Sequence, residues 1–241
     1  MHYSYTTRVR FSELDHRGRV NEAGVINFFQ DASTFQSEAL GVGVDYLFSI
    51  NRVWVLNSWN IVFERDLKLG DEIVVTTWPC AFKGLLAERD FTITLKTGEM
   101  CAKAMTNWAY VNLATGRPER IDEEAKRPYP PDEPLELPKA DRKIRMPQDM
   151  EERERFRVQK RDLDENGHVN NGKYVAMALE YLDESFCTGR LRVEYKKQAH
   201  YGDVFCPKVK REGSYFYVAM CDEAGKTCAN MCFEGKVSDE E

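Results

Sequence analysis

Two stretches, "LDHRGRVN" (residues 14–21) and "LDENGHVN" (residues 163–170), decide the fold, because five of their eight positions are identical. A segment typical of a β-strand precedes each stretch. A segment with apolar residues at helical intervals follows each one, over residues 22–40 and 171–186. The chain therefore contains an internal duplication, with one unit in each half.

The correspondence continues after the two helical segments. "WNIVFERDLKLGDEIVV" (59–75) matches "LRVEYKKQAHYGDVFCP" (191–207), and "TGEMCAKA" (97–104) matches "AGKTCANM" (224–231). Each unit is therefore predicted to hold a strand, a helix and about four further strands joined by hairpin-type turns. Because the apolar face of each helix needs a surface to pack on, we predict an α+β fold in which an antiparallel sheet curls around a long helix.

The prolines mark a boundary between the two units. Six of the nine prolines fall at positions 118–138, and "RPYPPDEPLELP" (127–138) suits neither a helix nor a central strand. We predict an N-terminal unit over residues 1–117, an extended linker over residues 118–150 and a C-terminal unit over residues 151–241.

Charge and composition exclude several classes of protein. The net charge of −6 is not that of a nucleic-acid-binding domain. The start "MHYSYTTRVRF" has no apolar core of a signal peptide, and no apolar run is long enough to cross a bilayer. The seven cysteines are odd in number and form no C-x-x-C pair, so we expect reduced core thiols in a cytoplasmic protein, without a metal site.

The two copies differ at two positions of the opening stretches. Asn166 and His168 stand where the first copy has Arg17 and Arg19. The fold does not require this Asn and this His, since the first copy lacks them, and that favours a chemical role for both. The plainer alternative, an Asn that caps a helix and a His that is only solvated, remains open at this point.

The same residues carry a resemblance to a known family. "LDENGHVNNGKY" (163–174) resembles the active-site motif of the acyl-acyl carrier protein thioesterases, an Asp-x-Asn-x-His-Val-Asn-Asn segment followed by Lys-Tyr. "NWAYVNLATGRPERI" (107–121) resembles the strand and turn that close the first unit in that family. The resemblance implies tandem hot-dog units and hydrolysis of the thioester between a fatty acyl chain and the phosphopantetheine arm of acyl carrier protein. The absence of a transit peptide suggests a bacterial member.

The resemblance implies roles for three side chains of the motif. His168 is the natural general base, because the reference pKa of histidine, about 6.5, suits neutral pH. Asn166 can position a water or the substrate carbonyl but cannot accept a proton. Asp164 either orients these two residues or only ties the turn. We also expect the amides near Gly167 to Val169 to be unpaired at the helix start, where they would bind the carbonyl oxygen.

One strand departs from the family pattern. The family strand that matches "VEYKKQA" (193–199) typically ends with a Glu, which many plant members follow with a Cys; here the residues are Gln198 and Ala199. Without a thiol at that position, covalent catalysis through this Cys is excluded, and a water route remains. Gln198 can hydrogen-bond the water but cannot act as a base.

The first unit is expected to hold the acyl chain. It lacks the Asn and the His of the motif, and its helical segment is the more aromatic of the two. The resemblance implies a pocket there, for which we select Phe28, Phe29 and Trp59, with Phe35 and Trp54 as further candidates. Such residues also form plain packed cores, which is the alternative interpretation.

Two alternative functions remain open from the sequence. One is an acyl-CoA thioesterase, and the other is a catalytically weak acyl-thioester binding protein, which Gln198 makes plausible. The expected partner is acyl carrier protein, without a cofactor, and the chain is expected to be a monomer or a homodimer. Acyl carrier proteins are acidic, so docking requires a local basic patch. Residues 139–161 hold nine Lys or Arg against five acids, and they form either this patch or a solvated charged linker.

Overall fold

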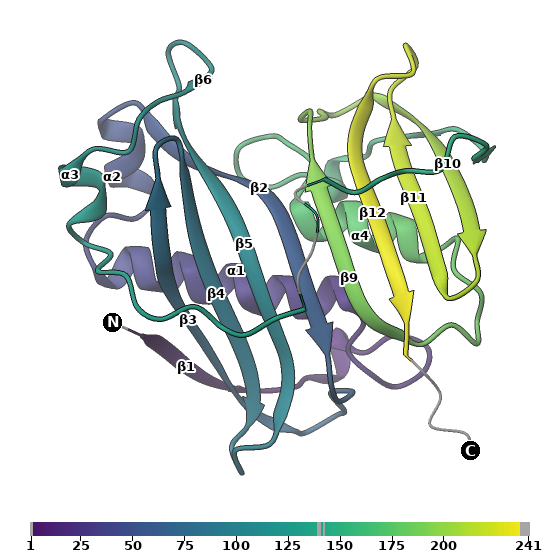
Figure 1. Cartoon of the computed structure of the whole chain (residues 1–241), viewed down its shortest axis with the longest axis horizontal. Coiled ribbons are helices and arrows are strands. Elements are labelled where there is room, and N and C mark those ends of the chain that lie inside the picture. The colour runs from purple at the N-terminus through teal and green to yellow at the C-terminus, as the bar shows by residue number, and fades with distance from the viewer. Residues whose placement is uncertain (1, 139–140, 142, 237–241) are drawn as a thin grey trace. The chain divides into compact units, whose positions relative to one another are not determined.

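The computed structural model describes residues 2–138, 141 and 143–236. The chain divides into two compact units, Met1–Pro138 and Lys139–Glu241. Figure 1 shows the first unit from purple to teal and the second from green to yellow. Each unit combines helix with an antiparallel sheet, as the duplication predicts.

The first unit contains an antiparallel sheet. The strand order is β1-β3-β4-β5-β2, and the short β6 pairs with β5. The elements in chain order are β1 (Tyr3–Arg8), the 3-10 helix η1 (Phe11–Glu13), α1 (Glu22–Ala39), α2 (Val44–Ser49), β2 (Arg52–Phe63), β3 (Glu72–Lys83), β4 (Leu86–Leu95), β5 (Met100–Asn112), β6 (Arg117–Pro118) and α3 (Glu123–Lys126).

Helix α1 lies along the face of this sheet (Figure 1). It begins after Asn21, whose side chain accepts a hydrogen bond from the amide of Gly24. Of the apolar residues at helical intervals in this segment, Val25, Phe28, Phe29 and Ala32 are buried. Phe35, a further candidate for the acyl-chain pocket, is 44% exposed. The buried face continues instead to Gln36, which is one full turn from Ala32.

The second unit repeats the arrangement with a shorter helix. The strand order is β9-β12-β11-β10-β7, and β8 pairs with β10. The elements are β7 (Glu151–Glu152), β8 (Phe156–Arg157), the 3-10 helix η2 (Lys160–Asp162), α4 (Asn171–Leu179), β9 (Thr188–Tyr195), β10 (Val204–Glu212), β11 (Tyr215–Cys221) and β12 (Thr227–Gly235). The helix expected to reach residue 186 ends at Leu179, and turns follow, closed by hydrogen bonds such as Phe186 N to Asp183 O.

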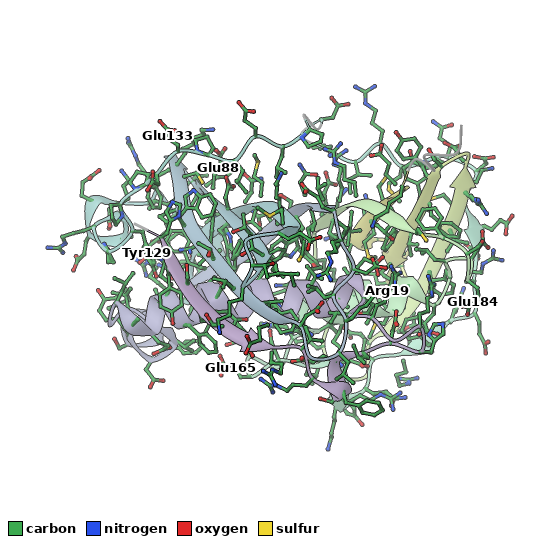
Figure 2. The ribbon with its side chains drawn as sticks, turned by 90° about the horizontal axis from the view of Figure 1, so that it is seen from below. Arg19, Glu88, Tyr129, Glu133, Glu165 and Glu184 are labelled. Carbon is green, nitrogen blue, oxygen red and sulfur yellow. The ribbon has the colours of Figure 1, made fainter. Side chains whose placement is uncertain are left out.

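The proline-rich segment packs on the first unit. It has no regular secondary structure from residue 129 to residue 138. Tyr129 is buried, and its hydroxyl lies 2.8 Å from the hydroxyl of Ser37 in α1. Trp78 Nε1 donates a hydrogen bond to the carbonyl of Glu133. Figure 2 labels Tyr129 and Glu133 of this segment, which lie beside the sheet.

The cysteines and the helices bear on the expected environment of the chain. All seven cysteines are free thiols, but Cys187 is exposed, so the assignment of all of them to the core was wrong. Among the described residues, no group of His, Cys, Asp or Glu is arranged to hold a metal ion. Within the same residues, no helix is both long and apolar enough to cross a membrane.

Candidate active site

The motif of the second unit forms a tight turn closed by Asp164. One oxygen of this carboxylate, Oδ1, accepts hydrogen bonds from the amides of Asn166 (2.9 Å) and His168 (3.1 Å). The amide of Asp164 donates in turn to the carbonyl of His168, and Gly167 adopts a positive φ of 75°. A positive φ favours glycine, which explains why this position holds one. Asp164 therefore ties the turn through the backbone.

The matching turn of the first unit has the same construction. Asp15 Oδ1 accepts hydrogen bonds from the amides of Arg17 (2.9 Å) and Arg19 (3.2 Å), and Gly18 has a φ of 73°. The Asp and the Gly shared by both copies are thus explained by turn geometry. What differs between the turns is the side chains that they present.

The amides before α4 are not free. Gly167 N donates to Asp164 O, His168 N to Asp164 Oδ1, and Val169 N to the carbonyl of Ala199 (2.9 Å). The helix begins at Asn171, after the N-cap Asn170. The expectation of unpaired amides near Gly167 to Val169 was therefore wrong, because the turn and a backbone bridge use these donors before the helix starts. The assignment of Gly167 and Val169 to substrate binding keeps no free donor to support it.

His168 is half-buried and lies against a second histidine. It forms an isolated antiparallel bridge with His200, and the centroids of the two rings are 4.9 Å apart at an interplanar angle of 73°. Burial lowers the pKa of His168 below 6.5; the Asp164 carboxylate opposes this shift, and His200 adds to it. A lowered pKa favours the neutral imidazole, which is the form that accepts a proton.

His200 was missed by the sequence analysis. The signal was present in the repeat, because "KLGD" of the first copy matches "HYGD" of the second. Lys68 bridges to Arg19 in the first unit as His200 bridges to His168 in the second. Pairing the two motifs segment by segment predicts this neighbour, whereas inspecting each motif alone does not.

Gln198 and Ala199 lie just after β9, next to the motif in the fold. Gln198 is exposed, and Ala199 is buried with its carbonyl bonded to Val169 N. The residue that matches Gln198 in the first unit is Asp66. Asp66 Oδ1 accepts a hydrogen bond from Arg19 Nη1 over 3.1 Å. Figure 2 labels Arg19 in the first-unit turn and Glu165 in the second-unit turn.

The residues selected for the acyl chain are tightly packed. Phe29 and Trp59 are almost fully buried and stack with ring centroids 5.8 Å apart, and Phe91 of β4 completes the cluster. Phe28 is also buried. A cavity of about 200 Å³ in the same unit has Trp54 in its wall, together with residues that include Leu47, Tyr110, Ala125 and Tyr129.

Two arginines of the basic run before the motif are paired with acids of the same run. Arg145 lies 3.1 Å from Asp141, and Arg153 lies 3.0 Å from Glu151. Arg142, a further basic residue of this run, lies outside the described residues. Local pairing of this kind reduces the positive field that the run presents to a partner.

Two family models match the chain along most of its length. The model of the acyl-ACP thioesterase N-terminal domain matches residues 1–129, and the model of the acyl-ACP thioesterase C-terminal domain matches residues 145–230.

Individual curated proteins are similar to this chain at modest sequence identity. A dodecanoyl-[acyl-carrier-protein] hydrolase of Cinnamomum camphora is 24% identical over 94% of this chain and 62% of its own length. An acyl-[acyl-carrier-protein] hydrolase of Cuphea viscosissima is 27% identical over 72% of this chain and 46% of its own length. The chain thus spans roughly half the length of the curated relatives that it matches.

Solved structures share the whole fold. The crystal structure of an acyl-ACP thioesterase from Bacteroides thetaiotaomicron superposes with a TM-score of 0.89 at 21% identity, and it covers 98% of each chain. The 12:0-ACP thioesterase from Umbellularia californica superposes with a TM-score of 0.85, also at 21% identity, over 98% of this chain and 97% of that chain. At this identity the likeness establishes the architecture alone: an α+β fold of two tandem hot-dog units.

Proposed function

The chain belongs to the acyl-ACP thioesterase family, and from this premise we propose that it hydrolyses fatty acyl-acyl carrier protein to a free fatty acid and the carrier-protein thiol, with His168 activating the water. The observation that carries the proposal is the pair of matching turns. Asp15 and Asp164 tie the same backbone, and only the second turn presents Asn166 and His168. The two units share the turn and differ in two side chains that it presents. We take this difference to indicate where a catalytic function was gained or lost in one unit.

The proposed reaction needs one base and one water. The neutral imidazole of His168 takes a proton from water while the water oxygen bonds to the thioester carbon. The C–S bond then breaks, and the proton passes to the departing sulfur, which gives the carboxylic acid and the thiol. Asn166 orients the water or the carbonyl through its amide, and Gln198 hydrogen-bonds the water. Asp164 serves through the backbone that it ties.

The chemical state of the cysteines supports a water route. Ala199 occupies the position where plant members of the family carry a Cys. Burial raises the pKa of Cys228 and Cys232 to about 11, and it also raises the pKa of Cys80, Cys101 and Cys221. These thiols stay protonated near neutral pH, and a protonated thiol is a poor nucleophile.

In this proposal the N-terminal unit holds the acyl chain and the C-terminal unit carries the catalytic residues. Phe28, Phe29 and Trp59 supply apolar surface in the first unit, and the cavity beside Trp54 offers space in the same unit. Each CH₂ of a chain buried there contributes about 0.8 kcal/mol of binding free energy. The partner of the reaction is acyl carrier protein, whose acidic surface requires a basic docking site on this chain.

One observation keeps a second candidate in view. Gln198 cannot ionise, so position 198 offers no carboxylate to His168, and this favours a catalytically weak acyl-thioester binding protein as the alternative. Turnover measured with matched acyl-carrier-protein and acyl-CoA thioesters separates the candidates. Hydrolysis of the carrier-protein thioester at the higher kcat/KM supports the proposal. Faster hydrolysis of the CoA thioester contradicts it in favour of a CoA enzyme, and binding without turnover contradicts it in favour of a binding protein.

A further inference from the structure

The ring of His168 is in contact with the ring of His200, an ionisable side chain outside the motif. His200 sits in the turn between β9 and β10, and 58% of its side-chain surface is exposed. The Asp203 carboxylate accepts a hydrogen bond from the His200 amide (2.9 Å), and Oδ2 of the same carboxylate lies 3.9 Å from the His200 Nδ1 atom. Asp203 N also donates to the His200 carbonyl. These two hydrogen bonds fix the backbone of His200 at the turn.

Resting on the hydrolase function proposed above, we propose that His200 is a positioning residue: its ring, in contact with the ring of His168, orients His168 and keeps it in the uncharged form that accepts a proton from water.

The first unit shows what the same framework does with a carboxylate. There the side chain that matches His168 is Arg19, and Asp66 at the position of Gln198 bonds it directly. An acid at that position stabilises a positive charge on its neighbour. In the second unit the same position is uncharged, and the group in contact with His168 is another imidazole. An imidazole that becomes protonated repels a second proton from its neighbour, so the contact acts in the opposite direction to an acid.

The other charged groups around the two rings define the background for a titration. Asp164 faces His168 from within its own turn, and Asp203 faces His200. Burial raises the pKa of Tyr174 in α4, and the Asp203 and Asp164 carboxylates add to this shift. Two cations lie on the β8 and η2 side: Arg157 donates to the carbonyl of Gly202, and Lys160 lies 5.7 Å from the centre of the Tyr201 ring. All of these side chains are present in every variant at position 200, so they form a common background for the comparison.

The repeat suggests the variants for the test. His200→Gln removes the charge, and His200→Lys makes it permanent with the residue that the first copy carries at the matching position, Lys68. The imidazole signals of the whole chain are followed by NMR between about pH 5 and 8. His168 is assigned from the signal lost in His168→Gln. His2→Gln, the same change in the first unit, is the matched control.

We expect the midpoint of the His168 titration to follow the order Lys, His, Gln at position 200, from lowest to highest pH. The Gln variant should lie about half a pH unit or more above wild type, as two charges about 5 Å apart require even at the dielectric constant of water. An unchanged midpoint across the three chains, or an equal shift in His2→Gln, overturns the proposal.

The acid limb of the pH profile of kcat/KM provides the second readout. It should shift in the same order across the three chains. If no chain hydrolyses the thioester, the proposed function fails while the NMR order still decides the role of His200. If hydrolysis occurs and the acid limb does not move, the positioning role fails and the function stands.

Discussion

Arg19 Nη1 donates a hydrogen bond to Asp66 Oδ1 over 3.1 Å, and the internal repeat places His168 and Gln198 at the two matching positions of the second unit. One unit has a paired cation and carboxylate where the other has an imidazole and an amide. A guanidinium held by a carboxylate keeps its proton and cannot act as a base at neutral pH. The first unit thus has the framework of the candidate site without the two side chains to which we assign its chemistry.

The two aspartates that tie the turns give a matched pair of variants. Asp164→Ala removes the acceptor of two amide hydrogen bonds and should cost about 1–3 kcal/mol in the free energy of unfolding, as should Asp15→Ala in the first unit. Asp164→Asn retains an oxygen acceptor and should keep most of the turnover. Denaturant unfolding and turnover are measured on all three variants. Loss of activity in a stable Asp164→Asn chain would show that the charge has a direct role.

Replacing Gln198 by Glu introduces a carboxylate at the position where the family typically has one, after β9 and one residue before Ala199, which bonds the motif. A nearby carboxylate favours the protonated imidazole, so the pKa of His168 should rise from its lowered value, and the acid limb of kcat/KM should move to higher pH. The sign follows because protonated His168 is inactive, so a higher pKa extends the inactive range upward. Turnover at the optimum should be unchanged or higher. Loss of turnover at every pH in a folded Gln198→Glu chain would mean that the amide of Gln198 itself is required.

The seven cysteines should be dispensable for hydrolysis. Single Cys→Ser or Cys→Ala variants test each thiol, with Cys187 as the exposed member of the set and Cys228 as a buried one. Buried variants are expected to lose some stability, so each rate is measured on folded protein. A stable variant that loses essentially all turnover, while the substrate still binds, would reveal a thiol nucleophile.

Chain-length preference should depend on the first unit. Large-to-small changes at Phe28, Phe29, Phe35, Trp54 and Trp59 are scored by the products formed from substrates of mixed length. Trp54, in the wall of the cavity, is the most informative, because Trp59 and Phe29 also support the core, where truncation costs about 3–5 kcal/mol. Room for two more carbons contributes roughly 1.6 kcal/mol, or about a tenfold shift toward longer chains. An unchanged profile in all of these variants, with shifts from Met177, Leu179 or Tyr181 instead, refutes the assignment.

The fold was predictable because the duplication repeats short-range sequence patterns whose structural meaning follows from backbone geometry and apolar burial. Asp, Gly and Asn mark the turn and the helix cap, and the apolar spacing marks α1. The apolar spacing does not predict that Phe35 is exposed while Gln36 is buried, because the burial of Gln36 depends on a partner distant in sequence. Gln36 Oε1 accepts a hydrogen bond from Arg89 Nη1 of β4, and no local pattern announces such a pair.

The candidate site is selected from the sequence alone, whereas its hydrogen bonds could not be predicted in the same way. His168 and Asn166 stand out from the comparison of the two copies, whereas the occupied amides of Gly167 and Val169 depend on where the backbone places Asp164 O and Ala199 O. His200 lies 32 residues after His168 in the sequence. The contact between His200 and His168 arises from antiparallel pairing of two segments distant in sequence. Inspection of one motif alone does not reveal such a contact.

The most direct test of the central claim is the hydrolysis of fatty acyl-acyl carrier protein by wild type and by His168→Ala at neutral pH. Glu165→Gln is the control, since Glu165 lies in the same turn with its side chain exposed. We predict turnover by wild type and by the control, and a loss of about 10²–10⁴-fold in a folded His168→Ala chain, the range expected for removing a general base. Near-wild-type turnover by His168→Ala would contradict the account.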